Sequence, residues 1–215
     1  MRRLLEAHTE IFDISYLFYS HLHPDHTGEL VPFLFANKYP DGLRRQIPLT
    51  IIAGKGFSHF YNGLKTVYGQ WIELAPGLFR IVELNNTALD TCRYDDFTVE
   101  SIPVEHNEES LAYRITSPGG DSVVYSGDTG YSDNLVTLAR DADILICESA
   151  FPDDLEVSGH LTPSLAGKIA TRANARKLVL THFYPECDHT DIEKECRKTY
   201  AGPLVLAEDL MKIEL

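Results

Sequence analysis

The sequence has little that would place the protein in a membrane, outside the cell or on a nucleic acid. No stretch approaches the roughly 18 apolar residues of a membrane-spanning helix. The first residues, MRRLLEAHTEIFDI, carry acids among the apolar positions and lack the apolar core of a signal peptide. Lys and Arg number 19 against 32 Asp and Glu, and the formal net charge of −13 repels phosphate backbones at long range. These absences argue against a membrane protein, a secreted protein and a general nucleic-acid binder.

Cysteine is also scarce, with four residues that form no CxxC pair: Cys92, Cys147, Cys187 and Cys196. Such wide spacing is typical of reduced thiols rather than of a disulfide framework, which predicts a cytoplasmic protein. Internal repeats, low-complexity segments and linkers are missing as well. A chain of 215 residues that is 44% hydrophobic can bury a sizeable core without a structural metal. We therefore expect a single domain over residues 1–215, in which any metal serves chemistry.

Apolar periodicity predicts interleaved helices and strands. The expected helices cover residues 2–10, 28–36, 57–70, 133–140, 163–174 and 190–200. The expected strands cover residues 12–19, 47–53, 78–84, 97–104, 112–116, 122–126, 143–147, 177–181, 203–207 and 210–214, with a hairpin turn at 118–121. The fold class is therefore α/β, or α+β in some schemes, with layered sheets.

Three of the nine histidines fall within six residues, directly after the first expected strand. The segment His21-Leu22-His23-Pro24-Asp25-His26 offers imidazole and carboxylate ligands at a density that suits Zn²⁺ or another borderline divalent ion. The alternative interpretation is a polar surface turn. Further ligand types recur where later strands end: His106, Asp128, Glu148 and His182. Because strand ends and their loops form the ligand crevice of layered α/β folds, we expect these side chains to converge on a metal site, with two ions.

These motifs resemble the metallo-β-lactamase superfamily. The similarity comprises HLHPDH, His106, the SGDT turn at 126–129, the segments 148–151 and 159–162, and THF at 181–183. Their order and spacing are most similar to the ribonuclease Z-like and small phosphodiesterase branches. The resemblance covers the chain from about residue 11 onward and implies a four-layer αββα sandwich.

The resemblance also implies a dinuclear centre. One metal would be held by His21, His23 and His106, and the second by Asp25, His26 and His182, with Asp128 bridging the pair. Zn²⁺ is the expected metal, with Mn²⁺ and Fe²⁺ as alternatives, because imidazole and carboxylate accept all three. The implied catalytic residues are Asp25, Glu148 and His160, with Glu148 holding the imidazole that protonates the leaving oxygen. The alternative for His160 is a purely structural role, in which it caps the helix expected from Thr162-Pro163.

Two metal ions with a bridging hydroxide can hydrolyse several kinds of bond. We expect a small or cyclic phosphodiester, since an anionic substrate completes the charge balance of a locally cationic site. A tRNA 3′ endonuclease of the ribonuclease Z type is the weaker candidate, because only 31 residues separate Asp128 from His160 and no basic inserted arm is present. Hydrolysis of a lactone, ester or thioester is the second enzymatic alternative. A metal-binding sensor without activity is the third, although all seven ligand positions are filled.

The remaining candidates are interpreted as structural or surface residues without a role in the site. His8, His59 and His189 read as surface or satisfied residues, Cys187 as structural, and the acids between 90 and 109 as a solvated face. Only 20 residues precede His21, which is fewer than the resembling family usually has, so the fold is expected to be shortened at its N-terminus. A shortened sheet would expose a strand edge, which predicts association into a homodimer.

Overall fold

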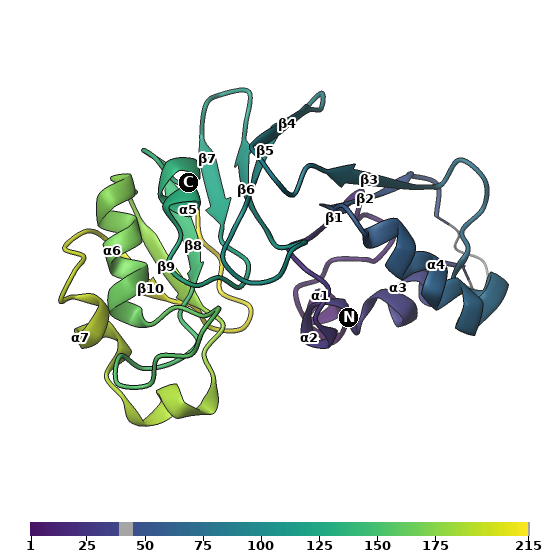
Figure 1. The fold of residues 1–215 in the computed structure, drawn as a ribbon. Coiled ribbons are helices and arrows are strands. Elements are labelled where there is room, and N and C mark those ends of the chain that lie inside the picture. Colours follow the sequence, from purple (N-terminus) through teal and green to yellow (C-terminus); the bar gives the residue numbers. More distant parts are fainter. Residues whose placement is uncertain (39–44, 215) are drawn as a thin grey trace. The chain divides into compact units, whose positions relative to one another are not determined.

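The chain forms two units, Met1–Leu84 and Asn85–Leu215, and each contains both strands and helices (Figure 1). The structure is a computed structural model that describes residues 1–38 and 45–214. Each unit has its own sheet and its own apolar core. The interleaving predicted from periodicity is therefore present in both, and the mixed α/β class is confirmed. Within the described ranges, no helix is both long and apolar enough to cross a membrane.

The first unit is built on a three-stranded parallel sheet in the order β1-β2-β3. The strands are β1 (Tyr16–Tyr19), β2 (Leu49–Gly54) and β3 (Phe79–Leu84). The helices are α1 (Arg2–Glu6), α2 (Pro24–Thr27), α3 (Leu30–Lys38), α4 (Phe57–Tyr68) and the 3-10 helix η1 (Gly69–Ile72). The central strand β2 is buried along its whole length, as expected for a strand covered on both faces. Its alternate side chains share one core with α3 and α4, made by Leu49, Ile51, Ala53, Leu30, Leu34, Phe57 and Tyr61.

The second unit contains a seven-stranded mixed sheet in the order β10-β9-β8-β7-β6-β5-β4. Its strands are β4 (Asp90–Arg93), β5 (Thr98–Pro103), β6 (Leu111–Thr116), β7 (Ser122–Tyr125), β8 (Ile144–Glu148), β9 (Leu178–Thr181) and β10 (Leu204–Leu206). Strands β4 to β7 pair antiparallel and β7 to β10 pair parallel. Strands β5, β7, β8 and β9 consequently run in one direction, so their carboxyl ends lie at one edge of the sheet.

Helices pack on this second sheet through small and branched apolar side chains. They are α5 (Asp133–Leu138), α6 (Pro163–Ala173) and α7 (Ile192–Cys196), with the 3-10 helix η2 (Pro185–His189). Helix α6 has Pro163 in its first turn, and its core face is formed by Ala166, Ile169, Ala170 and Ala173. These small residues let α6 approach the strands closely and fix the loop that precedes it.

Helix α6 also meets α7 at a glycine. A methyl group on Gly167 would lie 2.4 Å from Thr199 Oγ1 and 2.9 Å from the carbonyl oxygen of Cys196. We therefore expect Gly167→Ala to lower the free energy of unfolding by about 1–3 kcal/mol through overpacking. The control is Gly63→Ala in α4, where the methyl group would meet nothing within 4 Å. It should raise stability by about 0.5–1 kcal/mol, because alanine is the better helix former. Urea denaturation measures both, and equal effects would refute the close contact.

Three expectations differ from the structure. Strand β4 was missed, because its polar sequence DTCR alternates half-buried and exposed side chains at the sheet edge and carries little apolar signal. Residues 210–214 form no strand, since Leu210 has a positive φ of 65° and its side chain is exposed. The strand expected from residue 12 begins only at Tyr16. The other expected elements are present with boundaries shifted by a few residues.

Candidate metal centre

The HxHxDH segment gathers four ligand-type side chains within the first unit. It begins just after β1, and Pro24 opens the single turn of α2 that carries Asp25 and His26. The second half of the segment is therefore a short helical turn. The ring of His21, only 1% exposed, lies 4.7 Å from that of His23 and 4.1 Å from that of His26 between centroids. The Asp25 carboxylate is 3.3 Å from His26 Nε2.

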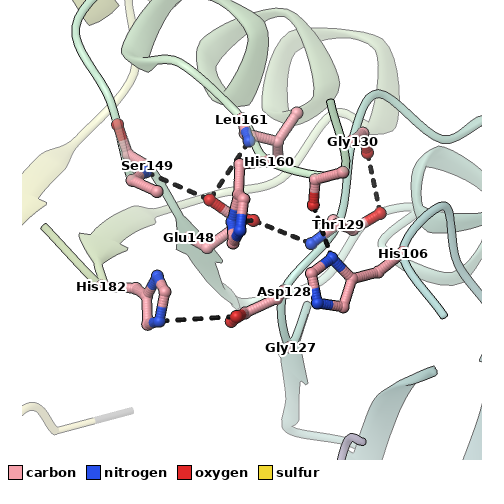
Figure 2. A network of polar contacts seen from close by, with 12 residues as sticks. His106, Gly127, Asp128, Thr129, Gly130, Glu148, Ser149, His160, Leu161 and His182 are labelled. Carbon is pink, nitrogen blue, oxygen red and sulfur yellow. Dashed lines mark hydrogen bonds and ion pairs between the residues drawn. The ribbon is translucent and has the colours of Figure 1, made fainter. Parts of the chain in front are cut away.

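In the second unit, Asp128 and His182 face each other from the ends of β7 and β9, the two strands on either side of β8 (Figure 2). Asp128 follows β7 and is 3% exposed, and its Oδ2 is 3.5 Å from Nε2 of His182. The turn before it contains Gly127 at φ 60°, a left-handed conformation that glycine adopts without strain. His182 itself has φ 63°, which is unusual for a residue with a Cβ. Strain of this kind is typical of functional sites.

His106 is held by the backbone of a distant loop. Its Nδ1 lies 2.9 Å from the carbonyl oxygen of Gly159, and since a carbonyl only accepts, Nδ1 carries the proton and donates it. Nε2 is then left with a lone pair, the state that a metal ligand needs. Gly159 has φ 84°, and a Cβ there would lie 3.0 Å from His106 Nδ1. Glycine at this position therefore lets the loop reach the ring.

Glu148 is a buried carboxylate that organises the loop around it. It is 1% exposed at the end of β8, and its oxygens accept hydrogen bonds from the backbone N–H groups of Thr129 at 2.8 Å, Ala150 at 3.1 Å and Leu161 at 3.1 Å. A fourth contact joins Oε1 to Nδ1 of His160 at 3.0 Å (Figure 2). These four contacts fix the position of the carboxylate and tie the surrounding loop to it. The Nδ1–H of His160 points at this carboxylate, which orients the imidazole ring.

All five ligand-type residues expected in this unit lie at the edge where β5, β7, β8 and β9 end. The rings of His106 and His160 are 5.1 Å apart, and those of His160 and His182 are 5.9 Å apart. Ligand atoms of Glu148, His160 and His182 lie within 4.8 Å of one another. Imidazole nitrogens and carboxylate oxygens at this density fit Zn²⁺, Mn²⁺ or Fe²⁺. The alternative for His160 does not describe its contacts, since residue 162 is the N-cap of α6 and His160 bonds to Glu148.

The candidates given an ordinary structural interpretation are not members of the ligand clusters found among the described residues. His8 follows α1, His59 lies in α4 and exposed His189 ends η2. The Cys187 thiol is buried and contacts the carbonyl oxygen of Ala150 at 3.2 Å. Burial raises the pKa of this thiol, so it stays protonated at neutral pH.

Tyr184 was not singled out from the sequence. Its ring lies 5.4 Å from that of His182 and 6.1 Å from that of His160. The available signal was its position two residues beyond a ligand at the end of a strand.

Comparison with known proteins identifies the family. The family described as "Beta-lactamase superfamily domain" matches residues 2–183. The chain belongs to the metallo-β-lactamase superfamily. A crystal structure of YhfI from Bacillus subtilis, described as a metallo-β-lactamase fold protein, has a TM-score of 0.77 and 24% identity, covering 95% of this chain and 79% of that one. The superfamily resemblance and its fold are thus confirmed.

Two relatives in this superfamily cover most of the chain. An uncharacterised protein of Mycobacterium tuberculosis, Rv1339, is 30% identical over 206 residues, which are 93% of this chain and 72% of the relative. Ribonuclease Z of Methanosarcina mazei is 27% identical over 278 residues, covering 100% of this chain and 85% of the relative. Superfamily membership and the cluster of histidine and carboxylate ligands together support a hydrolase that uses divalent metal.

Proposed function

We propose that this protein hydrolyses a small or cyclic phosphodiester with two divalent metal ions, and that these ions are Zn²⁺. The observation that carries this proposal is the contact between Glu148 and His160, because it orients an imidazole for proton transfer beside His106 and His182. An alkoxide leaving group of a phosphodiester needs a proton as its bond to phosphorus breaks. Hydrolysis of a lactone or thioester is the alternative, since a hydroxide attacks acyl carbon equally well.

The proposed ligand set is the one that the family resemblance implies. His21, His23 and His106 would hold one ion, Asp25, His26 and His182 the other, and Asp128 both. These seven ligands include two carboxylates and five neutral imidazoles, so half of the ions' positive charge is cancelled by protein. An anionic substrate completes the balance, which favours a phosphodiester over a neutral lactone.

The protein groups have distinct tasks in this proposal. When bound, the two ions supply a hydroxide at neutral pH and neutralise charge on the phosphoryl oxygens. His160 delivers a proton from Nε2 to the leaving oxygen, and Glu148 holds the ring in the required orientation through Nδ1. Asp25 acts in the catalytic centre as a ligand. The carbonyl oxygen of Gly159, 2.9 Å from Nδ1, keeps His106 in its ligand tautomer.

Several features favour a small substrate over a tRNA. The net charge of −13 repels a polyanion, and 31 residues between Asp128 and His160 are occupied by α5 and β8. The alignment with the M. mazei ribonuclease Z is 278 positions long against 215 residues here, so at least 63 positions lack a counterpart in this chain. The similarity to that enzyme keeps a tRNA 3′ endonuclease as the second candidate.

A panel of substrates tests this proposal. Under defined Zn²⁺ or Mn²⁺, the protein should hydrolyse bis(p-nitrophenyl) phosphate and a cyclic nucleotide. Their kcat/KM should exceed that of a lactone or thioester by about 100-fold or more. A chelator should abolish the activity, and returning the metal should restore it. A preference for the thioester or lactone would contradict the phosphodiester assignment, and a preference for pre-tRNA would support the endonuclease instead.

Location and assembly remain part of the proposal. All four cysteines lie in the part of the chain that the structure describes, and none of them forms a disulfide there. This agrees with a reducing compartment, and we propose the cytoplasm. Association into a homodimer stays a prediction, and a monodisperse monomer in light scattering would contradict it.

A further inference from the structure

Two aromatic rings stand beside the histidines of the second unit. The rings of Phe151 and Tyr184 are 4.8 Å apart at an interplanar angle of 31°. Phe151 lies 5.7 Å from the ring of His160, and Tyr184 lies 5.4 Å from that of His182. The two aromatic residues thus form a wall next to the imidazole proposed as general acid and to a proposed metal ligand.

The backbone fixes this wall by extending the pairing of β8 and β9 beyond their ends. The N–H of Ser149 donates to the carbonyl oxygen of Thr181 at 2.9 Å, and the N–H of Tyr184 donates to that of Ala150 at 3.1 Å. The two rings are therefore carried by neighbouring strand extensions rather than by separate mobile loops. A rigid aromatic surface loses little conformational entropy when a ligand stacks on it.

Core packing does not account for the wall. Phe183, between the metal ligand and Tyr184, packs against the main apolar core of the second unit. Tyr184 is not one of the residues that pack against that core. Its side chain is 36% exposed, and Phe151 is half-buried. A partly exposed aromatic pair among histidines and carboxylates is a surface for a flat apolar ring.

We infer that Tyr184 and Phe151 form a stacking platform for the base of a nucleoside phosphodiester. This inference rests on the proposed function, and it names the substrate class of that same site. In such a substrate one sugar separates the phosphorus from the base, so a phosphoryl group at the metal ligands leaves the base beside the wall. Every base has a flat π face, and stacking on an aromatic side chain requires no counter-charge from this acidic protein.

Binding of two phosphate monoesters to the metal-loaded protein tests the platform. Adenosine 5′-monophosphate carries a base at the position where ribose 5-phosphate carries a hydroxyl group, and isothermal titration calorimetry gives a Kd for each. Wild-type protein should bind the nucleotide about 10-fold more tightly or better, in line with the contribution of one stacked base. Tyr184→Ala should remove most of this preference without changing the Kd of ribose 5-phosphate, whereas Tyr184→Phe should keep it.

The matched control is Tyr68→Ala, which removes a similarly exposed tyrosine (43%) from the first unit and should change neither Kd. Equal affinity of wild-type protein for the two ligands would overturn the inference. So would a Tyr184→Ala variant that weakens both ligands alike, because that result means the ring only positions His182. If phosphodiesters are hydrolysed without any base preference, only the platform fails. If neither ligand binds and no phosphodiester is hydrolysed, the proposed function fails with it.

Discussion

Replacing Asp128 by alanine is expected to release both metal ions and to lower kcat/KM for a phosphodiester by about 10³-fold or more. The side chain is 3% exposed after β7, and its Oδ2 faces His182 Nε2 at 3.5 Å. If this carboxylate is shared by both ions, its loss weakens both metal sites at once. It also removes a negative charge that offsets the repulsion between the two cations. Metal content per chain, measured by mass spectrometry of the purified variant, and the rate on bis(p-nitrophenyl) phosphate give the two readouts.

The control for this variant is Asp154→Ala, which removes an exposed carboxylate in the same unit. It should keep the wild-type metal content and rate. An Asp128→Ala protein that retains two tightly bound ions would show that Asp128 is not shared between them. A variant that loses one ion and keeps the other would assign Asp128 to a single site.

Replacing His160 by alanine should leave the metal content unchanged and reduce kcat by about 10² to 10⁴ on a cyclic nucleotide. The reason is that His160 is outside both proposed ligand sets, while its Nδ1 contact with Glu148 at 3.0 Å aims Nε2 at the leaving oxygen. A p-nitrophenolate leaving group is a weak base and departs without a proton. The loss on bis(p-nitrophenyl) phosphate should therefore be much smaller than the loss on the cyclic nucleotide.

Exposed His189 provides the matched control, since His189→Ala also removes a histidine from this unit and should alter neither rate. Equal losses on both substrates would argue against proton delivery by His160. Loss of metal would make His160 a ligand instead, as its proximity to Glu148 and His182 allows. Glu148→Gln is a poor substitute for this test, because an amide cannot accept hydrogen bonds at both ends from Thr129, Ala150 and Leu161.

Local chemistry explains why so much of the candidate site could be predicted from the sequence. HLHPDH is dense in ligands, and the other candidates follow short apolar strands that periodicity locates well. Strand direction then brings Asp128, Glu148 and His182 to one edge of the sheet, as parallel pairing of β7, β8 and β9 requires. The contact of Glu148 with His160 was expected only from the family resemblance, and the structure contains it.

Features that depend on tertiary contacts could not be predicted in this way. Strand β4 exists because it pairs with β5, although its own residues are polar. The carbonyl group of Gly159 fixes the tautomer of His106, although the two residues are 53 positions apart in the sequence. The positive φ of Gly159 could not be predicted from the sequence either. In the sequence, Tyr184 looks like any aromatic residue of a loop. Only its ring contacts with His182 and Phe151 identify it as part of the site.

The metal content of the wild-type protein, purified without chelator, tests the central claim most directly. The account predicts two divalent ions per chain by mass spectrometry under native conditions, both removed by a strong chelator. Fewer than one ion per chain, in protein that remains folded and is supplied with Zn²⁺ and Mn²⁺, would contradict the account and with it every enzymatic function considered for this protein.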